Sequence, residues 1–156
     1  MSIEKAQELQ KTNPKNIIMD IYTDWCGPCK LMDKNTFQNQ EVAKFLNDNF
    51  YAVKFNAEGN SVVNYKGKIY KNPGYKETKS ARNSSHNFTR YLGVYGYPTI
   101  VFFDKNTNPI APITGYLTPQ QIEIYLNLFR DEKYLQIKSQ DDFKEFLNNF
   151  ESKFKS

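Results

Sequence analysis

Both cysteines of the chain, Cys26 and Cys29, lie in the stretch YTDWCGPCKLM, residues 22–32. Two cysteines separated by two residues can form a redox-active pair, supply half of a metal site, or be an accident of composition. A closed zinc site needs four ligands, but the chain has no third cysteine and a single histidine, His86. A purely structural disulfide across so short a loop would add little stability. The spacing therefore favours redox chemistry, with no metal.

A cysteine hydrolase would need a histidine oriented as a base beside the nucleophile. His86 stands in the polar stretch RNSSHNF, which is typical of a surface or helix-cap residue. We therefore expect no hydrolytic site.

The elements around the cysteines are expected to position the two sulfurs. The apolar run NIIMDIYT, residues 16–23, predicts a buried strand that leads into a helix. At the start of that helix the Cys26 thiol would ionise easily, with a pKa on the order of 7 or lower. Cys29, one turn further in and less exposed, would resolve a mixed disulfide by attacking Cys26. Gly27 allows close backbone approach, and Pro28 suits the first helical turn.

Hydrophobic periodicity predicts the remaining elements. A helix should continue after the cysteines through KLMDKNTF; further helices are expected over residues 3–11, 39–50, 85–94, 119–129 and 141–150, and strands over 51–57, 98–104 and 108–116. This order predicts an α/β fold with helical crossovers between parallel strands. Ser84 or Ser85 is expected to cap the helix over 85–94, and the final ESKFKS to fray.

Residues 59–84 interrupt the pattern, since they are rich in Gly, Asn, Lys, Tyr and Ser. Within them VVNYKGKIYKN predicts a small hairpin with Gly67 in its turn. At 156 residues the chain fits one domain. We interpret it as a single domain over residues 1–156, with an insertion at 59–84 and a C-terminal extension at 131–156.

Composition excludes several classes of function. The chain is 39% hydrophobic and its net charge of +4 is spread without a basic run, so we expect a globular domain that does not bind nucleic acid. No apolar stretch approaches the roughly 20 residues that cross a bilayer. The start, MSIEKAQELQKTNP, lacks the apolar core of a secretory signal. We therefore leave the compartment open, with the cytoplasm expected for the sequence as written and the periplasm or cell envelope expected if a signal peptide was removed.

The stretches WCGPCK and MDIYTD, together with YGYPTIVFF at 95–103, resemble the thioredoxin family. The resemblance implies the thioredoxin fold, a central mixed β-sheet with helices on both faces, here with an insertion and an added C-terminal helix. It implies that Pro98, between Tyr97 and Thr99, is cis and lies against the disulfide. The backbone groups of Tyr97 would then point outward and pair with an extended substrate. Gly115 falls at the glycine that lines the family's substrate groove.

The family also has a buried acid before the motif, paired with a lysine on the next strand, and Asp20 and Lys54 match these positions. Asp20 would act as the base for Cys29. The alternative is an acid and a lysine at strand ends facing solvent, but the apolar neighbours of Asp20 favour the functional interpretation. Trp25, directly before Cys26, is expected to form a wall of the substrate surface, or otherwise to be a core aromatic.

The predicted function is a thiol–disulfide oxidoreductase that reduces protein disulfides through Cys26 and Cys29. The alternatives are a disulfide oxidant or isomerase, and a binding or assembly module that keeps the fold without turnover. The resemblance implies no cofactor besides the redox-active disulfide. Expected partners are disulfide-containing protein substrates and an upstream protein reductant, and the chain is expected to be a monomer. The sequences flanking the motif look more like thioredoxin-like proteins of the bacterial cell envelope than like the small general thioredoxin.

Overall fold

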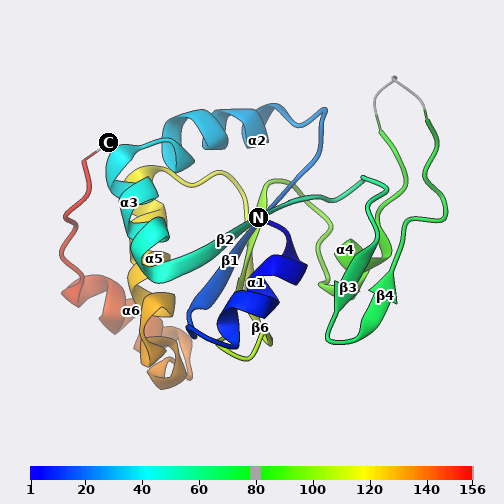
Figure 1. The fold of residues 1–156 in the computed structure, drawn as a ribbon. Helices are drawn as coiled ribbons and strands as arrows, with labels where there is room; N and C mark the ends of the chain where they lie inside the picture. Colours follow the sequence, from blue (N-terminus) through cyan, green and yellow to red (C-terminus); the bar gives the residue numbers. More distant parts are fainter. Residues whose placement is uncertain (78–81, 156) are drawn as a thin grey trace.

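The computed structural model describes residues 1–77 and 82–155 (Figure 1). Its elements, in chain order, are α1 (Ile3–Gln10), β1 (Asn16–Tyr22), α2 (Gly27–Met32), the π-helical turn η1 (Asp33–Phe37), α3 (Gln40–Asn49), β2 (Phe50–Asn56), β3 (Val63–Tyr65), β4 (Lys68–Tyr70), α4 (Asn87–Tyr91), β5 (Thr99–Phe103), β6 (Pro109–Thr114), α5 (Pro119–Arg130), the 3₁₀ helix η2 (Glu132–Gln136) and α6 (Gln140–Asn149). Every predicted helix and strand is present. The one change of type is η1, which replaces the second part of the helix expected after the cysteines. Within the two described ranges, each helix is too short or too polar to cross a bilayer.

The central sheet has four strands in the order β2-β1-β5-β6. β1 runs parallel to β2 and antiparallel to β5, and β5 runs antiparallel to β6. The parallel pair requires a crossover, which α2, η1 and α3 provide. The sheet is therefore mixed, as predicted.

Alternate side chains of β1 enter two hydrophobic cores, one on each face of the sheet. Ile17, Met19 and Ile21 pack in the core that includes residues of α1, the β3–β4 hairpin and α4. Ile18 packs in the core that includes residues of α2, α3 and α5, with aromatic side chains of α6 against it. Figure 1 shows α3, α5 and α6 gathered on one side of the sheet, with α4 and the hairpin on the other. This burial on both faces explains why β1 is a nearly continuous apolar run.

The predicted hairpin of the insertion is confirmed: β3 and β4 pair antiparallel around Lys66 and Gly67. Both turn residues have positive φ, 51° and 80°, which is the backbone of a tight two-residue turn and suits a glycine. Tyr65 and Tyr70 hold the hairpin to the domain, because their rings lie 5.1 and 5.2 Å from that of the fully buried Phe88. The insertion thus shares the hydrophobic core of the domain.

The cap of α4 differs from the prediction. His86, not Ser84 or Ser85, is the N-cap residue, and its Nδ1 accepts the N–H of Phe88 at 3.0 Å. Its Nε2 lies 2.6 Å from the Ser61 carbonyl oxygen, so this nitrogen donates while Nδ1 accepts. Burial lowers the pKa of His86, which keeps the ring neutral. His86 is therefore a helix cap, as one interpretation had it, but it is buried and does not lie at the surface.

The final residues are pinned, contrary to the expectation that they fray. Glu123 of α5 is almost fully buried, and its carboxylate accepts the Ser152 hydroxyl at 2.8 Å and the backbone N–H groups of Lys153 and Phe154 at 2.8 and 3.2 Å. A buried carboxylate needs such donors. The bonds hold residues 152–154 against α5.

Candidate active site

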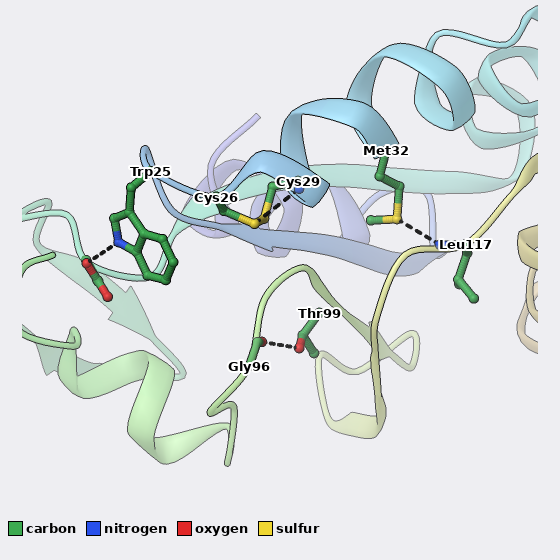
Figure 2. The surroundings of a disulfide bond; sticks show 8 residues. Trp25, Cys26, Cys29, Met32, Gly96, Thr99 and Leu117 are labelled. Atoms are coloured by element: carbon green, nitrogen blue, oxygen red, sulfur yellow. Dashed lines mark hydrogen bonds between the residues drawn. A yellow bond between two sulfur atoms is a disulfide. The ribbon is translucent and has the colours of Figure 1, made fainter. Parts of the chain in front are cut away.

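Cys26 and Cys29 form a disulfide where β1 gives way to α2 (Figure 2). Cys26 is the N-cap residue of α2, and its sulfur accepts the backbone N–H of Cys29 at 3.1 Å. Gly27 begins the helix and Pro28 stands in its first turn, where a missing N–H costs nothing. The short motif therefore places both sulfurs at the end of a strand that is fixed by the core.

The expected order of exposure of the two cysteines is wrong. Cys26 is 3% exposed and Cys29 is 7% exposed, so Cys29 is not the less exposed one. The reason is that the Cys26 sulfur turns back over the first helical turn, where it is bonded to Cys29 and contacts the Cys29 N–H.

The loop before β5 brings the other expected substrate residues together. The Tyr97–Pro98 peptide is cis, and the Pro98 carbonyl accepts the Gly115 N–H at 2.8 Å. Thr99 is fully buried, and its hydroxyl donates to the Gly96 carbonyl at 2.6 Å. Figure 2 draws this loop beside the disulfide. Thr99 and Gly115 therefore hold the loop in place, while Tyr97 is only partly buried.

Trp25 lies at the surface beside the disulfide, with 39% of the residue exposed. Its Nε1 donates to Glu58 Oε1 at 2.9 Å, and its ring makes an edge contact with Tyr97 at 6.4 Å between centroids. The Arg82 guanidinium carbon lies 4.5 Å from the Trp25 ring centroid. Trp25 is thus an exposed side chain that Glu58, Tyr97 and Arg82 hold in place, and not a core aromatic; its role as a wall of the substrate surface stays a prediction.

Sequence reasoning missed Glu58 and Arg82. Glu58 follows the end of β2, the parallel neighbour of β1, and the carboxyl ends of parallel strands meet at one edge of a sheet. This acid was therefore detectable in principle. Arg82 gives no such signal, since only the folding of the insertion brings it to Trp25.

Asp20 and Lys54 are direct neighbours across β1 and β2. Lys54 Nζ lies 3.5 Å from the carboxylate of Asp33, which begins η1. Among the described residues no ion pair within 4.0 Å joins Lys54 to Asp20 itself. Lys54 therefore influences Asp20 as a nearby charge, while its contact is with Asp33.

Burial raises the pKa of Asp20 from its usual 3.8 to about 6; the Lys54 charge opposes this rise and the Asp33 charge adds to it. Asp20 and Cys29 also line the same cavity of about 180 Å³, together with Thr23 and Lys54. The carboxyl group and the second cysteine thus face one space. The arrangement suits proton exchange between them, although the role of Asp20 as a base stays a prediction.

Fold and site together define a thioredoxin-fold protein with a disulfide-forming Cys-Gly-Pro-Cys pair. The profile of the family described as "Thioredoxin-like domain" matches residues 3–130. Because this match covers most of the chain, the protein belongs to the thioredoxin-like domain family, as its motifs predicted.

The chain is similar to curated proteins named "Thiol:disulfide interchange protein DsbD". It is 28% identical to the one from Tatumella citrea over 128 residues, which are 81% of this chain and 18% of that protein. It is 27% identical to the one from Escherichia coli (strain K12) over 125 residues, or 79% of this chain and again 18% of the relative. The chain therefore spans about a fifth of the length of these relatives.

Solved structures agree on the fold. A thioredoxin-fold protein from Helicobacter pylori superposes with a TM-score of 0.65 at 19% identity, covering 87% of this chain and 81% of its own. The C-terminal domain of DsbD from Neisseria meningitidis, in the reduced form, gives a TM-score of 0.55 at 16% identity, covering 81% and 91%. At such identities the likeness concerns the fold alone, and it confirms the predicted fold class.

Proposed function

We propose that this protein is a thiol–disulfide oxidoreductase that reduces protein disulfides through Cys26. The observation that carries the proposal is the Cys26–Cys29 disulfide at the start of α2, where the Cys29 N–H contacts the Cys26 sulfur at 3.1 Å. In the reduced protein the same N–H would stabilise a Cys26 thiolate. The relatives named for thiol:disulfide interchange support this chemistry. Both the thiol–disulfide exchange and its reductive direction are our proposal.

In the first step the Cys26 thiolate attacks one sulfur of a substrate disulfide. The substrate S–S bond breaks, a mixed disulfide forms, and the leaving thiolate takes up a proton from solvent. Cys29 then loses its proton to the Asp20 carboxylate and attacks the Cys26 sulfur. The second substrate thiolate departs and the Cys26–Cys29 disulfide forms, so two electrons have passed from the protein to the substrate.

The pKa of Asp20 suits the transfer of the Cys29 proton. With a value of about 6, the carboxyl group is mostly ionised at neutral pH yet is a stronger base than an ordinary aspartate. Both groups line the same cavity, which supports direct or relayed transfer. The positive charge of Lys54 would keep the pKa of Asp20 from rising further, because it favours the ionised carboxylate.

The proposed substrate edge is the backbone around Tyr97. Pro98 already gives its carbonyl to Gly115, whereas neither backbone group of Tyr97 takes part in the hydrogen bonds found among residues 1–77 and 82–155. An extended substrate segment can therefore add there as a short strand. Trp25 would form the adjoining wall.

The cycle closes when a dithiol protein reduces the Cys26–Cys29 disulfide. We propose such an upstream reductant, with the domain acting as a monomer and with no cofactor besides its own disulfide. Light scattering of the purified protein checks the monomer, and reduction of the oxidised protein by candidate dithiol domains checks the donor.

Trapping tests the proposed function. The Cys29→Ser variant should accumulate mixed disulfides at Cys26, because the resolving thiol is gone, and the matched Cys26→Ser variant should accumulate far fewer. The wild type should reduce insulin disulfides in the presence of a dithiol. Absence of both trapped species and insulin reduction would refute the activity.

The redox potential tests the direction. A value near about −270 mV fits a thioredoxin-like reductant, whereas a value near about −120 mV fits a strong oxidant. Equilibration of the protein with glutathione buffers measures it. An oxidising value would overturn the reductive direction while leaving the exchange chemistry in place.

A further inference from the structure

The far end of the insertion returns to the substrate face of the disulfide. The guanidinium carbon of Arg82 lies 4.5 Å from the centroid of the Trp25 ring, and Trp25 directly precedes Cys26. The charge of Arg82 also acts on Tyr97, the residue before the cis proline. A segment 56 residues away in sequence from the motif thus adds a cation to the surface that surrounds it.

The position of Arg82 is built into the fold by its neighbours. The Asn83 N–H donates to Glu58 Oε1 at 2.7 Å, and the same oxygen accepts the Trp25 indole N–H. The Asn83 side chain bonds both backbone groups of Lys76, at 3.0 and 2.7 Å. One carboxylate oxygen therefore ties the tryptophan and the end of the insertion together.

Ser84, which follows Asn83 in the chain, is held as well. The Asn72 side chain donates to the carbonyl of Ser84 at 2.7 Å and to that of Gly59 at 2.9 Å. Because Gly59 and Ser84 stand at the two ends of the insertion, Asn72 clamps both ends to each other. The backbone that carries Arg82 is thus fixed relative to Trp25.

The charges around Trp25 differ in what they present to a substrate. Glu58 is 6% exposed and its Oε1 already accepts two N–H groups. This carboxylate therefore holds Trp25 and Asn83 in place and presents little surface to a substrate. Arg82 is exposed and lies against the Trp25 ring. Asp24, the exposed acid nearest in sequence, accepts a hydrogen bond from Asn56 and lines the cavity of Asp20 and Cys29. The exposed charge on the Trp25 ring itself is therefore the positive charge of Arg82.

We propose that Arg82 is a specificity-determining residue that favours protein substrates with an acidic side chain close to their cystine. A substrate that lies against Trp25 meets the guanidinium on the same ring, where a carboxylate can pair with it. This inference rests on the proposed function, since it names the substrate class that the same site selects. It also gives the insertion a role, which is to carry a charged determinant to a fixed place beside Cys26.

The test measures the attack of Cys26 on matched peptides. Each peptide carries one cysteine activated as a mixed disulfide with nitrothiobenzoate, and the peptides differ only in flanking glutamates, glutamines or lysines. The reduced Cys29→Ser protein releases the coloured leaving group once per molecule, so the rate reports recognition without turnover. Dividing by the rate for the glutamine peptide removes any general change in the reactivity of Cys26.

With Arg82 present, the glutamate peptide should react about two- to fivefold faster than the glutamine peptide at low salt, the range expected for an exposed ion pair. The preference should fall as ionic strength rises. In the Arg82→Gln background it should approach one, and in the Arg82→Glu background the lysine peptide should become the faster. Arg130→Gln is the matched control, because Arg130 pairs with Asp131 beside Asn16 at the opposite end of β1.

Each result decides something. A preference for the glutamate peptide that persists in Arg82→Gln, or no preference in the parent, would overturn the assignment while Cys26 still reacts, so the proposed function would stand. A failure of Cys26 to react with any peptide would overturn the proposed function and this inference with it. Loss of the preference in Arg130→Gln would show that overall charge is responsible, and would overturn the assignment to Arg82.

Discussion

Replacing Asp20 by asparagine should make the oxidised protein more stable at neutral and alkaline pH. Burial raises the pKa of Asp20 from 3.8 to about 6, so the folded protein binds this proton more tightly than the unfolded chain does. The wild type therefore loses stability as pH rises from about 4 to about 6, and the loss is complete above the folded pKa. Since each tenfold change in proton affinity corresponds to about 1.4 kcal/mol, ionisation of the buried carboxylate lowers the free energy of unfolding by about 3 kcal/mol.

The measurement is urea unfolding of the oxidised wild type and Asp20→Asn proteins between about pH 4 and pH 8. The difference in the free energy of unfolding should grow in favour of the variant over this range and then level off. Asp24→Asn is the matched control, since Asp24 is an exposed acid that lines the same cavity as Asp20. A difference that is the same at every pH would refute the reasoning, because an effect of packing alone does not titrate. The same variant should resolve mixed disulfides more slowly, for it lacks the proposed base.

Asp33→Asn should lower the pKa of Asp20, since it removes a nearby negative charge and frees Lys54 from its contact at 3.5 Å; the pH profile of the resolving step should move to lower pH, and an unmoved profile would contradict this. Phe88→Ala should cost about 3 to 5 kcal/mol in urea unfolding, because the ring is fully buried where the insertion meets the domain. Glu58→Ala should cost about 1 to 3 kcal/mol by leaving two partly buried N–H donors without their charged acceptor. The Glu58→Ala variant should also shift the fluorescence emission of the single tryptophan, so an unchanged spectrum would be evidence against the link that Glu58 makes between Trp25 and Asn83.

The features that the sequence predicts well are those with local causes. The apolar run before the motif predicts a strand, because a strand with both faces covered buries nearly all its side chains, as β1 does. Gly67 predicts the tight turn, because glycine readily adopts the positive φ that is found there. The cysteine spacing fixes the first turn of α2 in the same local way. Periodicity and turn chemistry are enough for such elements.

What escaped prediction depends on contacts between distant segments. Nothing in the polar stretch around His86 indicates that its ring becomes buried, since this follows from the carbonyl of Ser61 lying 2.6 Å away in the folded insertion. The partner of Lys54 was missed because Asp33, where α2 passes into η1, meets the lysine of β2 only through the packing of the helix on the sheet.

The charged groups of the site fall into two sets, one around the cavity that Cys29 lines and one beside Trp25. Asp20, Lys54 and Asp33 line the cavity that Cys29 also lines, so in the proposed cycle they would govern where the second thiol sends its proton. Arg82 belongs to the surface around Trp25, which precedes Cys26, and so acts on what the first thiol meets. The first set lies on β1, β2 and η1, elements of the thioredoxin fold itself, whereas the second depends on the insertion. A change in the insertion can therefore alter the choice of substrate while the proton chemistry of the cysteine pair stays the same.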